Sequence, residues 1–179
     1  MLLPPSGALA ASTKYPGVAQ LLLLPSRVST SKKILVVEDN EDCRELQACV
    51  IRRLGYLVIE ADNGAAAIAE ALAGHPDLIL MDLNMPKMNG EEATEQLKNQ
   101  PSTRDIPVII CTAYGPGPRV DRARDAGAVE ILHKPFKFSE LEILLRKHVP
   151  DDPKNEAEGG HPSSAANCTE TSKFPFQAR

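Results

Sequence analysis

Three carboxylates follow apolar runs that have the composition of buried β-strands. Asp82 comes directly after residues 78–81, and Glu38 and Asp39 come directly after residues 34–37. Unbroken apolar runs of this length are typical of strands in a parallel sheet that helices cover on both faces. In such a sheet, ligands bind outside the carboxyl ends of the strands. We therefore expect the three carboxylates to meet at one edge of the sheet.

A cluster of three carboxylates needs a cation, because the acids otherwise repel one another and raise one another's pKa. Mg²⁺ suits a site of few carboxylates that also holds water and phosphate. Two further polar side chains complete the edge, since Thr112 follows the apolar run 108–111 and Lys134 follows residues 129–133. A metal, a carboxylate nucleophile, an ammonium and a hydroxyl are the groups that phosphoryl transfer requires. A carboxylate that attacks phosphorus forms an acyl phosphate.

The apolar pattern also predicts the elements that would position these residues. A helix is expected after each strand, and these helices end near Gly55, Gly74, Asn99, Gly127 and Pro150. Alternation of this kind gives an α/β fold, a doubly wound five-stranded parallel sheet of flavodoxin-like order 2-1-3-4-5 with helices on both faces. The expected strands are residues 34–37, 56–61, 78–81, 108–111 and 129–133.

Two details of helix packing follow from the same pattern. Ile68 and Leu72 are expected to form the inner stripe of the second helix. A capping box of Ser139 and Glu142 is expected to begin the last helix.

The fourth helix, at about residues 119–125, is expected to be poorly anchored. Val120 and Ala123 are its apolar anchors, and the Gly- and Pro-rich loop 114–118 before it is expected to be mobile. Basic residues at positions 119, 122 and 124 alternate with Asp121 and Asp125, which indicates a solvated helix face.

Length and composition are those of one domain with tails. The chain has 179 residues, 42% of them hydrophobic, and a formal charge of -4. Residues 1–31 are expected to be a disordered leader or linker and residues 150–179 a disordered tail, which leaves residues 32–149 as the folded domain. Mild acidity argues against nucleic-acid binding through a basic face, and no segment reaches the ~20 apolar residues that span a membrane. The four cysteines form no CxxC pair, which argues against zinc and agrees with a cytoplasmic location.

Five segments, in this order along the chain, carry a resemblance to a known family. They are ILVVEDN (34–40), LMDLNMP (80–86), CTA (111–113), AGA (126–128) and KPF (134–136). With them, residues 32–149 resemble the receiver domain of two-component response regulators, the fold family of the bacterial chemotaxis regulator.

The resemblance implies a metal site and a phosphoacceptor. Asp82 would accept a phosphoryl group from a phosphohistidine, on a sensor histidine kinase or a phosphotransfer protein. Asp39 would bind Mg²⁺ directly and Glu38 through water, together with Asp82 and the backbone carbonyl of Asn84.

The resemblance also implies a switch. Lys134, whose bond to Pro135 is usually cis in the family, would pair with the phosphoryl group. Thr112 would swing toward it and carry the loop 114–118 and the next helix. Output would then pass to a downstream protein through the surface of the fourth helix, fifth strand and fifth helix. Catalysis would be limited to self-catalysed phosphorylation and dephosphorylation, so the domain is not an enzyme toward other substrates.

The resemblance does not decide the context of the domain. The ~30 residues after the last helix are too few for a typical effector domain, which favours a stand-alone receiver. A receiver taken from a hybrid kinase would have the same sequence pattern, and homodimer formation stays open. Neither nucleic acid nor membrane is expected as a partner.

The chain departs from the family pattern at three positions. Ile131 stands where the family has its switch aromatic, so no aromatic rotamer change can report phosphorylation there. Tyr114 is bulky enough to cover part of the site, and Asn84 has no acid with which to activate water. We therefore expect a phosphoryl state that lasts longer than in fast-cycling relatives.

Two other classes share part of this pattern. A phosphohydrolase of the haloacid-dehalogenase type also uses Asp, Mg²⁺, Thr or Ser, and Lys, but it needs a second Asp two residues after the nucleophile, where this chain has Asn84. A Rossmann nucleotide-binding module is disfavoured because no GxGxxG follows the first strand.

Overall fold

The computed structural model describes residues 32–149, in which five parallel strands form one sheet of order β2-β1-β3-β4-β5. The segments 1–31 and 150–179, for which disorder is predicted, lie outside the described residues. This sheet confirms the predicted α/β fold and its strand order. Its elements, in chain order, are β1 (Lys33–Val37), α3 (Glu41–Arg53), β2 (Leu57–Ala61), α4 (Gly64–Gly74), β3 (Leu78–Asp82), α5 (Gly90–Asn99), β4 (Val108–Thr112), α6 (Pro118–Asp125), β5 (Glu130–His133) and α7 (Phe138–His148).

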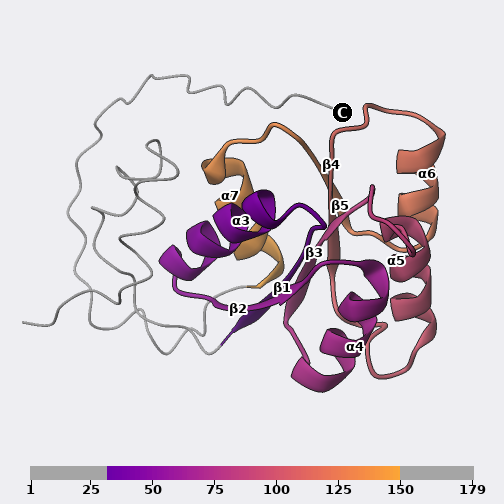
Figure 1. The fold of residues 1–179 in the computed structure, drawn as a ribbon, viewed down its shortest axis with the longest axis horizontal. Helices are drawn as coiled ribbons and strands as arrows, with labels where there is room; N and C mark the ends of the chain where they lie inside the picture. Colours follow the sequence, from indigo (N-terminus) through magenta and orange to yellow (C-terminus); the bar gives the residue numbers. More distant parts are fainter. Residues whose placement is uncertain (1–31, 150–179) are drawn as a thin grey trace, which may run out of the picture.

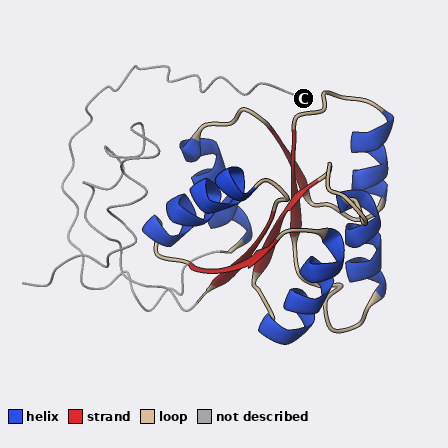
Figure 2. Ribbon diagram, in the orientation of Figure 1, coloured by secondary structure: helices blue, strands red, loops and turns tan. Residues whose placement is uncertain are grey.

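Helices cover both faces of the sheet, with α3 and α7 on one face and α4, α5 and α6 on the other (Figures 1 and 2). Every residue of β3 and β4 is buried, because these central strands are covered on both sides. Alternate strand residues therefore belong to two separate cores. On the α3 and α7 side, Ile34, Leu80 and Ile109 meet Ile51 and Leu141. On the other side, Met81 and Ile110 meet Ala71, Leu97 and Val120.

Asparagine side chains fix the start of the three helices that follow β1, β2 and the β3 loop. Asn40, Asn63 and Asn89 each accept a hydrogen bond from the backbone N–H three residues later. Such N-caps satisfy a donor that the first helical turn otherwise leaves unpaired. Each helix therefore begins at a defined distance from the strand end before it.

Two helix predictions are wrong in detail. The predicted inner stripe of α4 is correct for Ile68, which packs against the core, but wrong for Leu72, which is 40% exposed. The small residues Ala67 and Ala71 are the fully buried ones. The reason is that α4 packs closely against β2, which leaves room for small side chains only. A Cβ at Gly74, the last residue of α4, would lie 2.5 Å from Cδ1 of Ile59 in β2.

The predicted capping box at Ser139 is also wrong, because α7 begins at Phe138. Phe138 packs against the core on the α3 and α7 side, which draws the helix start toward it. Glu140 accepts a hydrogen bond from the backbone N–H of Lys137 at 3.3 Å and so helps to cap the first turn.

Lys98 connects α5 with two segments that follow it. Its Nζ donates to the backbone oxygens of Arg104 at 2.9 Å and Ile106 at 2.7 Å, in the connection before β4. Its aliphatic stem lies against Gly127, where a Cβ would come within 2.9 Å of Cγ of Lys98. Gly127 has a φ of +102°, which glycine adopts without strain.

Within residues 32–149, every helix is too short or too polar to cross a membrane.

Candidate functional site

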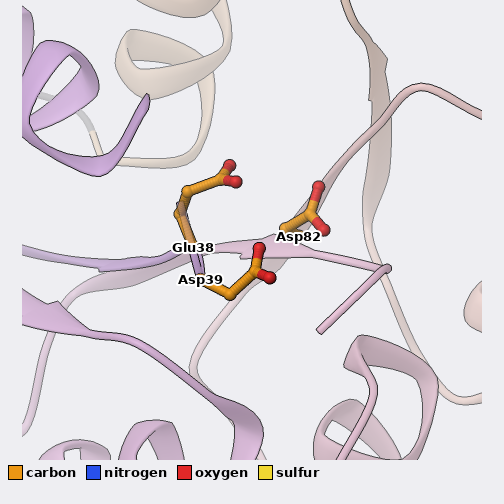
Figure 3. A group of neighbouring side chains, drawn as sticks. All are labelled: Glu38, Asp39 and Asp82. Carbon is orange, nitrogen blue, oxygen red and sulfur yellow. The ribbon is translucent and has the colours of Figure 1, made fainter. Parts of the chain in front are cut away.

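Three carboxylates gather at the carboxyl ends of β1 and β3. These strands are neighbours in the sheet, with Val37 paired to Met81, so the residues that follow them lie side by side. Glu38, Asp39 and Asp82 each place a carboxylate oxygen within 4.8 Å of the others. Figure 3 shows the three side chains as neighbours, with Glu38 and Asp39 next to each other and Asp82 beside them. Glu38 and Asp82 are buried, whereas Asp39 is exposed and opens the cluster to solvent.

Lys134, which follows the outermost strand β5, contacts two of these carboxylates. Its Nζ lies 2.5 Å from Oε2 of Glu38 and 2.7 Å from Oδ1 of Asp82. Its backbone N–H donates to the carbonyl of Thr112 at 2.7 Å, which holds the start of the segment after β5 beside β4. The bond from Lys134 to Pro135 is cis, as the family resemblance implies.

Burial and charge act in opposite directions at this cluster. Burial raises the pKa of Glu38 above its ordinary value, and the nearby Lys134 only partly offsets this. Burial alone would lower the pKa of Lys134, but the charges of Glu38 and Asp82 outweigh it and raise that pKa. The ammonium therefore stays protonated, and three carboxyl groups gather around this one cation.

Two other candidate residues, Asn84 and Thr112, make hydrogen bonds after the ends of β3 and β4. The backbone N–H of Asn84 donates to Oδ2 of Asp82 at 2.6 Å, so both carboxylate oxygens of Asp82 accept a hydrogen bond. Thr112, the last residue of β4, is buried, and its hydroxyl oxygen accepts from the backbone N–H of Tyr114 at 3.1 Å. Thr112 therefore stands at the start of the loop that leads to α6.

Tyr114 reaches back from this loop toward the site. Its hydroxyl donates to Oδ1 of Asn84 at 3.3 Å, and its backbone oxygen lies 2.9 Å from Nδ1 of His133. The guanidinium of Arg119 lies over its ring, 4.5 Å from the centroid. The phenol thus lies beside the loop that follows Asp82.

Two residues of α3 hold Glu38, and neither is predicted from the sequence. Gln47, which is buried, donates from Nε2 to Oε2 of Glu38 at 3.2 Å. Arg44 donates to the backbone oxygen of Glu38 at 2.8 Å. Gln47 shares a helix face with Val50 and Ile51, so its spacing from these apolar residues was a signal that a polar side chain would be buried there.

The residues present fit a hard divalent cation. The cluster offers oxygen ligands and opens to solvent at Asp39, so a hydrated ion could enter. Relief of the repulsion among the carboxylates would favour binding.

The family comparison decides what kind of domain holds this site. The family model of the response regulator receiver domain matches residues 34–146. The chain belongs to this family. This confirms the resemblance that the motifs indicated, and the site described above lies entirely within the receiver domain.

Relatives and solved structures agree with this assignment. The polar-differentiation response regulator DivK of Brucella ovis is 34% identical over 121 residues, which cover 68% of this chain and 98% of that protein. The transcriptional regulatory protein PdtaR of Mycobacterium tuberculosis is 32% identical over 149 residues, covering 83% of this chain and 71% of that protein. Among solved structures, the receiver domain of the sensor histidine kinase PA1611 from Pseudomonas aeruginosa, with a magnesium ion coordinated in its active-site cleft, is 33% identical with a TM-score of 0.63. That match covers 66% of this chain and 97% of that structure.

Proposed function

We propose that this receiver domain accepts a phosphoryl group on Asp82 and uses the change to alter a protein-binding surface. The observation that carries the proposal is the contact of Lys134 with both Asp82 and Glu38, which brings together residues from the ends of β1, β3 and β5. An ammonium held 2.7 Å from Oδ1 of Asp82 is placed to pair with a phosphoryl oxygen on that carboxylate.

The transfer itself needs little from the protein beyond position and charge. A carboxylate oxygen of Asp82 attacks phosphorus, the P–N bond of a phosphohistidine breaks, and the electron pair stays on the imidazole, which then takes up a proton. The backbone N–H of Asn84, 2.6 Å from Oδ2, orients the carboxylate. Lys134 balances the charge of the phosphoryl oxygens, and the hydroxyl of Thr112 can then donate to one of them.

Mg²⁺ is the metal that we propose for the site. Asp39, Asp82 and the backbone carbonyl of Asn84 would hold it, with Glu38 acting through water, and bound Mg²⁺ would neutralise charge on the phosphoryl group. The magnesium ion in the PA1611 receiver domain supports this proposal, as does the gathering of three carboxyl groups within 4.8 Å of one another.

The surface made by α6, β5 and α7 is the proposed output surface. Thr112 begins the loop that leads to α6, and Val120 and Ala123 are the buried residues of that helix. A movement of Thr112 toward the phosphoryl group would thus act on a helix with a small buried face. Val129, directly before β5, and Ile143, in α7, are exposed and offer apolar area to a partner.

The proposed partners are therefore of two kinds. A sensor histidine kinase or phosphotransfer protein would supply the phosphoryl group, and a downstream protein would bind the output surface. The functional unit would be residues 32–149, acting in the cytoplasm and catalysing only its own phosphorylation and dephosphorylation.

Incubation with acetyl phosphate and Mg²⁺, followed by intact-mass measurement, tests the proposal. We expect one phosphoryl adduct on the full chain, which does not form when Mg²⁺ is left out and is absent from Asp82→Asn. The same adduct on Asp82→Asn would reject Asp82 as the acceptor. Steady turnover of a generic phosphomonoester would instead favour a phosphohydrolase.

A further inference from the structure

Arg119 makes two contacts that connect the loop after β4 with α5. Its guanidinium carbon lies 4.5 Å from the centroid of the Tyr114 ring, and its Nε donates to Oε1 of Glu91 at 3.1 Å. A guanidinium over an aromatic ring is attractive because the ring face is negative. The ion pair with Glu91 fixes the guanidinium of Arg119, and the fixed guanidinium in turn limits the movement of the Tyr114 ring.

Glu91 is in turn fixed relative to Asp82. It is the second residue of α5, and Gly90 before it packs so closely that a Cβ there would lie 2.2 Å from the backbone oxygen of Asp82. The side chain of Glu91 is only 12% exposed and accepts a second hydrogen bond, from Nε of Arg122 at 2.8 Å. The two arginines hold the pKa of Glu91 below its ordinary value despite the opposing effect of burial.

The contacts return to Asp82 through Asn84. The hydroxyl of Tyr114 donates to Oδ1 of Asn84 at 3.3 Å, and the backbone N–H of Asn84 donates to Oδ2 of Asp82 at 2.6 Å. The Tyr114 ring is therefore held at its hydroxyl by the loop after Asp82, and at its face by Arg119. Both contacts therefore fix the position of the ring relative to Asp82.

We infer that Arg119 is a positioning residue, which holds the Tyr114 ring against Asn84, two residues after Asp82, and so lengthens the lifetime of a phosphoryl group on Asp82. The inference rests on the proposed function, because the lifetime has meaning only if Asp82 is phosphorylated. Arg119 touches neither Asp82 nor the other carboxylates of the site, so it acts through Tyr114 and the access of water.

Arg122 provides a matched control. It lies on the same helix and donates to the same carboxylate of Glu91, but its described contacts do not include the ring of Tyr114. Loss of either arginine weakens the attachment of α6 to α5, whereas only loss of Arg119 releases the ring.

The first experiment measures the half-life of the phosphoryl group on the full chain, after acetyl phosphate is removed. Arg119→Ala should shorten it about two- to fivefold, the factor expected for a cation–π contact near the surface. Arg122→Ala should stay near the wild-type value. In a Tyr114→Ala background, Arg119→Ala should have no further effect, because the ring that it holds is gone.

Two results would overturn the inference. One is an equal half-life in Arg119→Ala and Arg122→Ala, which would mean that Arg119 acts only by attaching α6. The other is an undiminished effect of Arg119→Ala in the Tyr114→Ala background.

A second measurement separates this inference from the proposed function. In the unphosphorylated protein, Arg119→Ala should shift the NMR signals of the Asn84 side-chain amide in the same direction as Tyr114→Phe, and Arg122→Ala should not. If no adduct forms on Asp82 in the wild type, the proposed function fails, and with it the effect on lifetime. If an adduct forms but the amide signals are unchanged in Arg119→Ala, the positioning role alone is rejected.

Discussion

Replacement of Lys134 by methionine tests whether the acidic cluster depends on this ammonium. The side chains of Lys134, Glu38 and Asp82 are 9%, 5% and 9% exposed, and Nζ of Lys134 contacts the carboxylates at 2.5 and 2.7 Å. Loss of one partner from a buried ion pair costs about 3–5 kcal/mol, because the remaining charge is left uncompensated. Because the site lies at the carboxyl ends of the strands and is open to solvent at Asp39, we expect a value at the low end of this range. Lys134→Met should lower the free energy of unfolding by about 3 kcal/mol.

Lys147→Met is the matched control. Lys147 also pairs with a glutamate, Glu130, but the two side chains are 59% and 29% exposed. Solvent screens such a pair, and its loss should cost about 1 kcal/mol or less. Urea unfolding at neutral pH without Mg²⁺ compares the two variants directly.

Addition of Mg²⁺ makes the test more specific. A ligand at about 100 times its Kd stabilises the folded state by about 2.7 kcal/mol. Lys134→Met should gain more stability from Mg²⁺ than the wild type does, because the ammonium no longer competes for Glu38 and Asp82. The reasoning is refuted if Lys134→Met loses no more stability than Lys147→Met, or if Mg²⁺ stabilises both variants equally.

Three further predictions concern the surroundings of the site. Tyr114→Ala should shorten the half-life of phospho-Asp82 severalfold, measured by loss of the phosphoryl adduct, because less of the site is covered. Gln47→Leu should weaken Mg²⁺ binding about tenfold in calorimetric titration, since Glu38 loses a hydrogen bond that orients it. Glu91→Gln should destabilise the protein by about 1 kcal/mol at neutral pH, and this difference should shrink as the pH falls below about 4.5.

The last prediction follows from the sign of the pKa shift. The pKa of Glu91 is lowered in the folded state, so its contribution is complete above the unfolded value and is lost as the pH falls through the folded value. An equal effect of Glu91→Gln at neutral and acidic pH would contradict it. For Tyr114 the contradicting result is an unchanged half-life. Tyr56→Phe is a control at a buried tyrosine next to the amino end of β1, whereas the acids follow the carboxyl ends of the strands. For Gln47 it is Mg²⁺ affinity equal to that of the wild type.

The central part of the site could be predicted from sequence because it depends on strand ends. Buried parallel strands are short apolar runs, so the polar residue after each run is easy to find. The topology then requires those residues to meet at one edge. Glu38, Asp39 and Asp82 lie together for this reason, and Lys134 reaches two of them from β5.

Residues that act from helices were harder to predict. The alternation of charges at positions 119–125 indicated a solvated helix face, but Arg119 and Arg122 bind Glu91 of α5. Which helices lie next to each other, and in which rotation, depends on packing between elements distant in sequence. The same limit explains Leu72, because the closeness of α4 to the sheet decides that alanines rather than leucine face inward.

Lys98 links three pieces of chain whose amides would otherwise exchange with solvent independently. Its ammonium binds the carbonyls of Arg104 and Ile106, and its stem supports the turn at Gly127. The end of α5, the connection before β4 and the turn before β5 should therefore open as one cooperative unit. Acetylation of this lysine, which would remove its charge, should divide that unit. Deuterium uptake by the backbone amides of residues 100–107 and 126–128 should then rise, while uptake by the amides of the strands that carry the acidic cluster should stay unchanged.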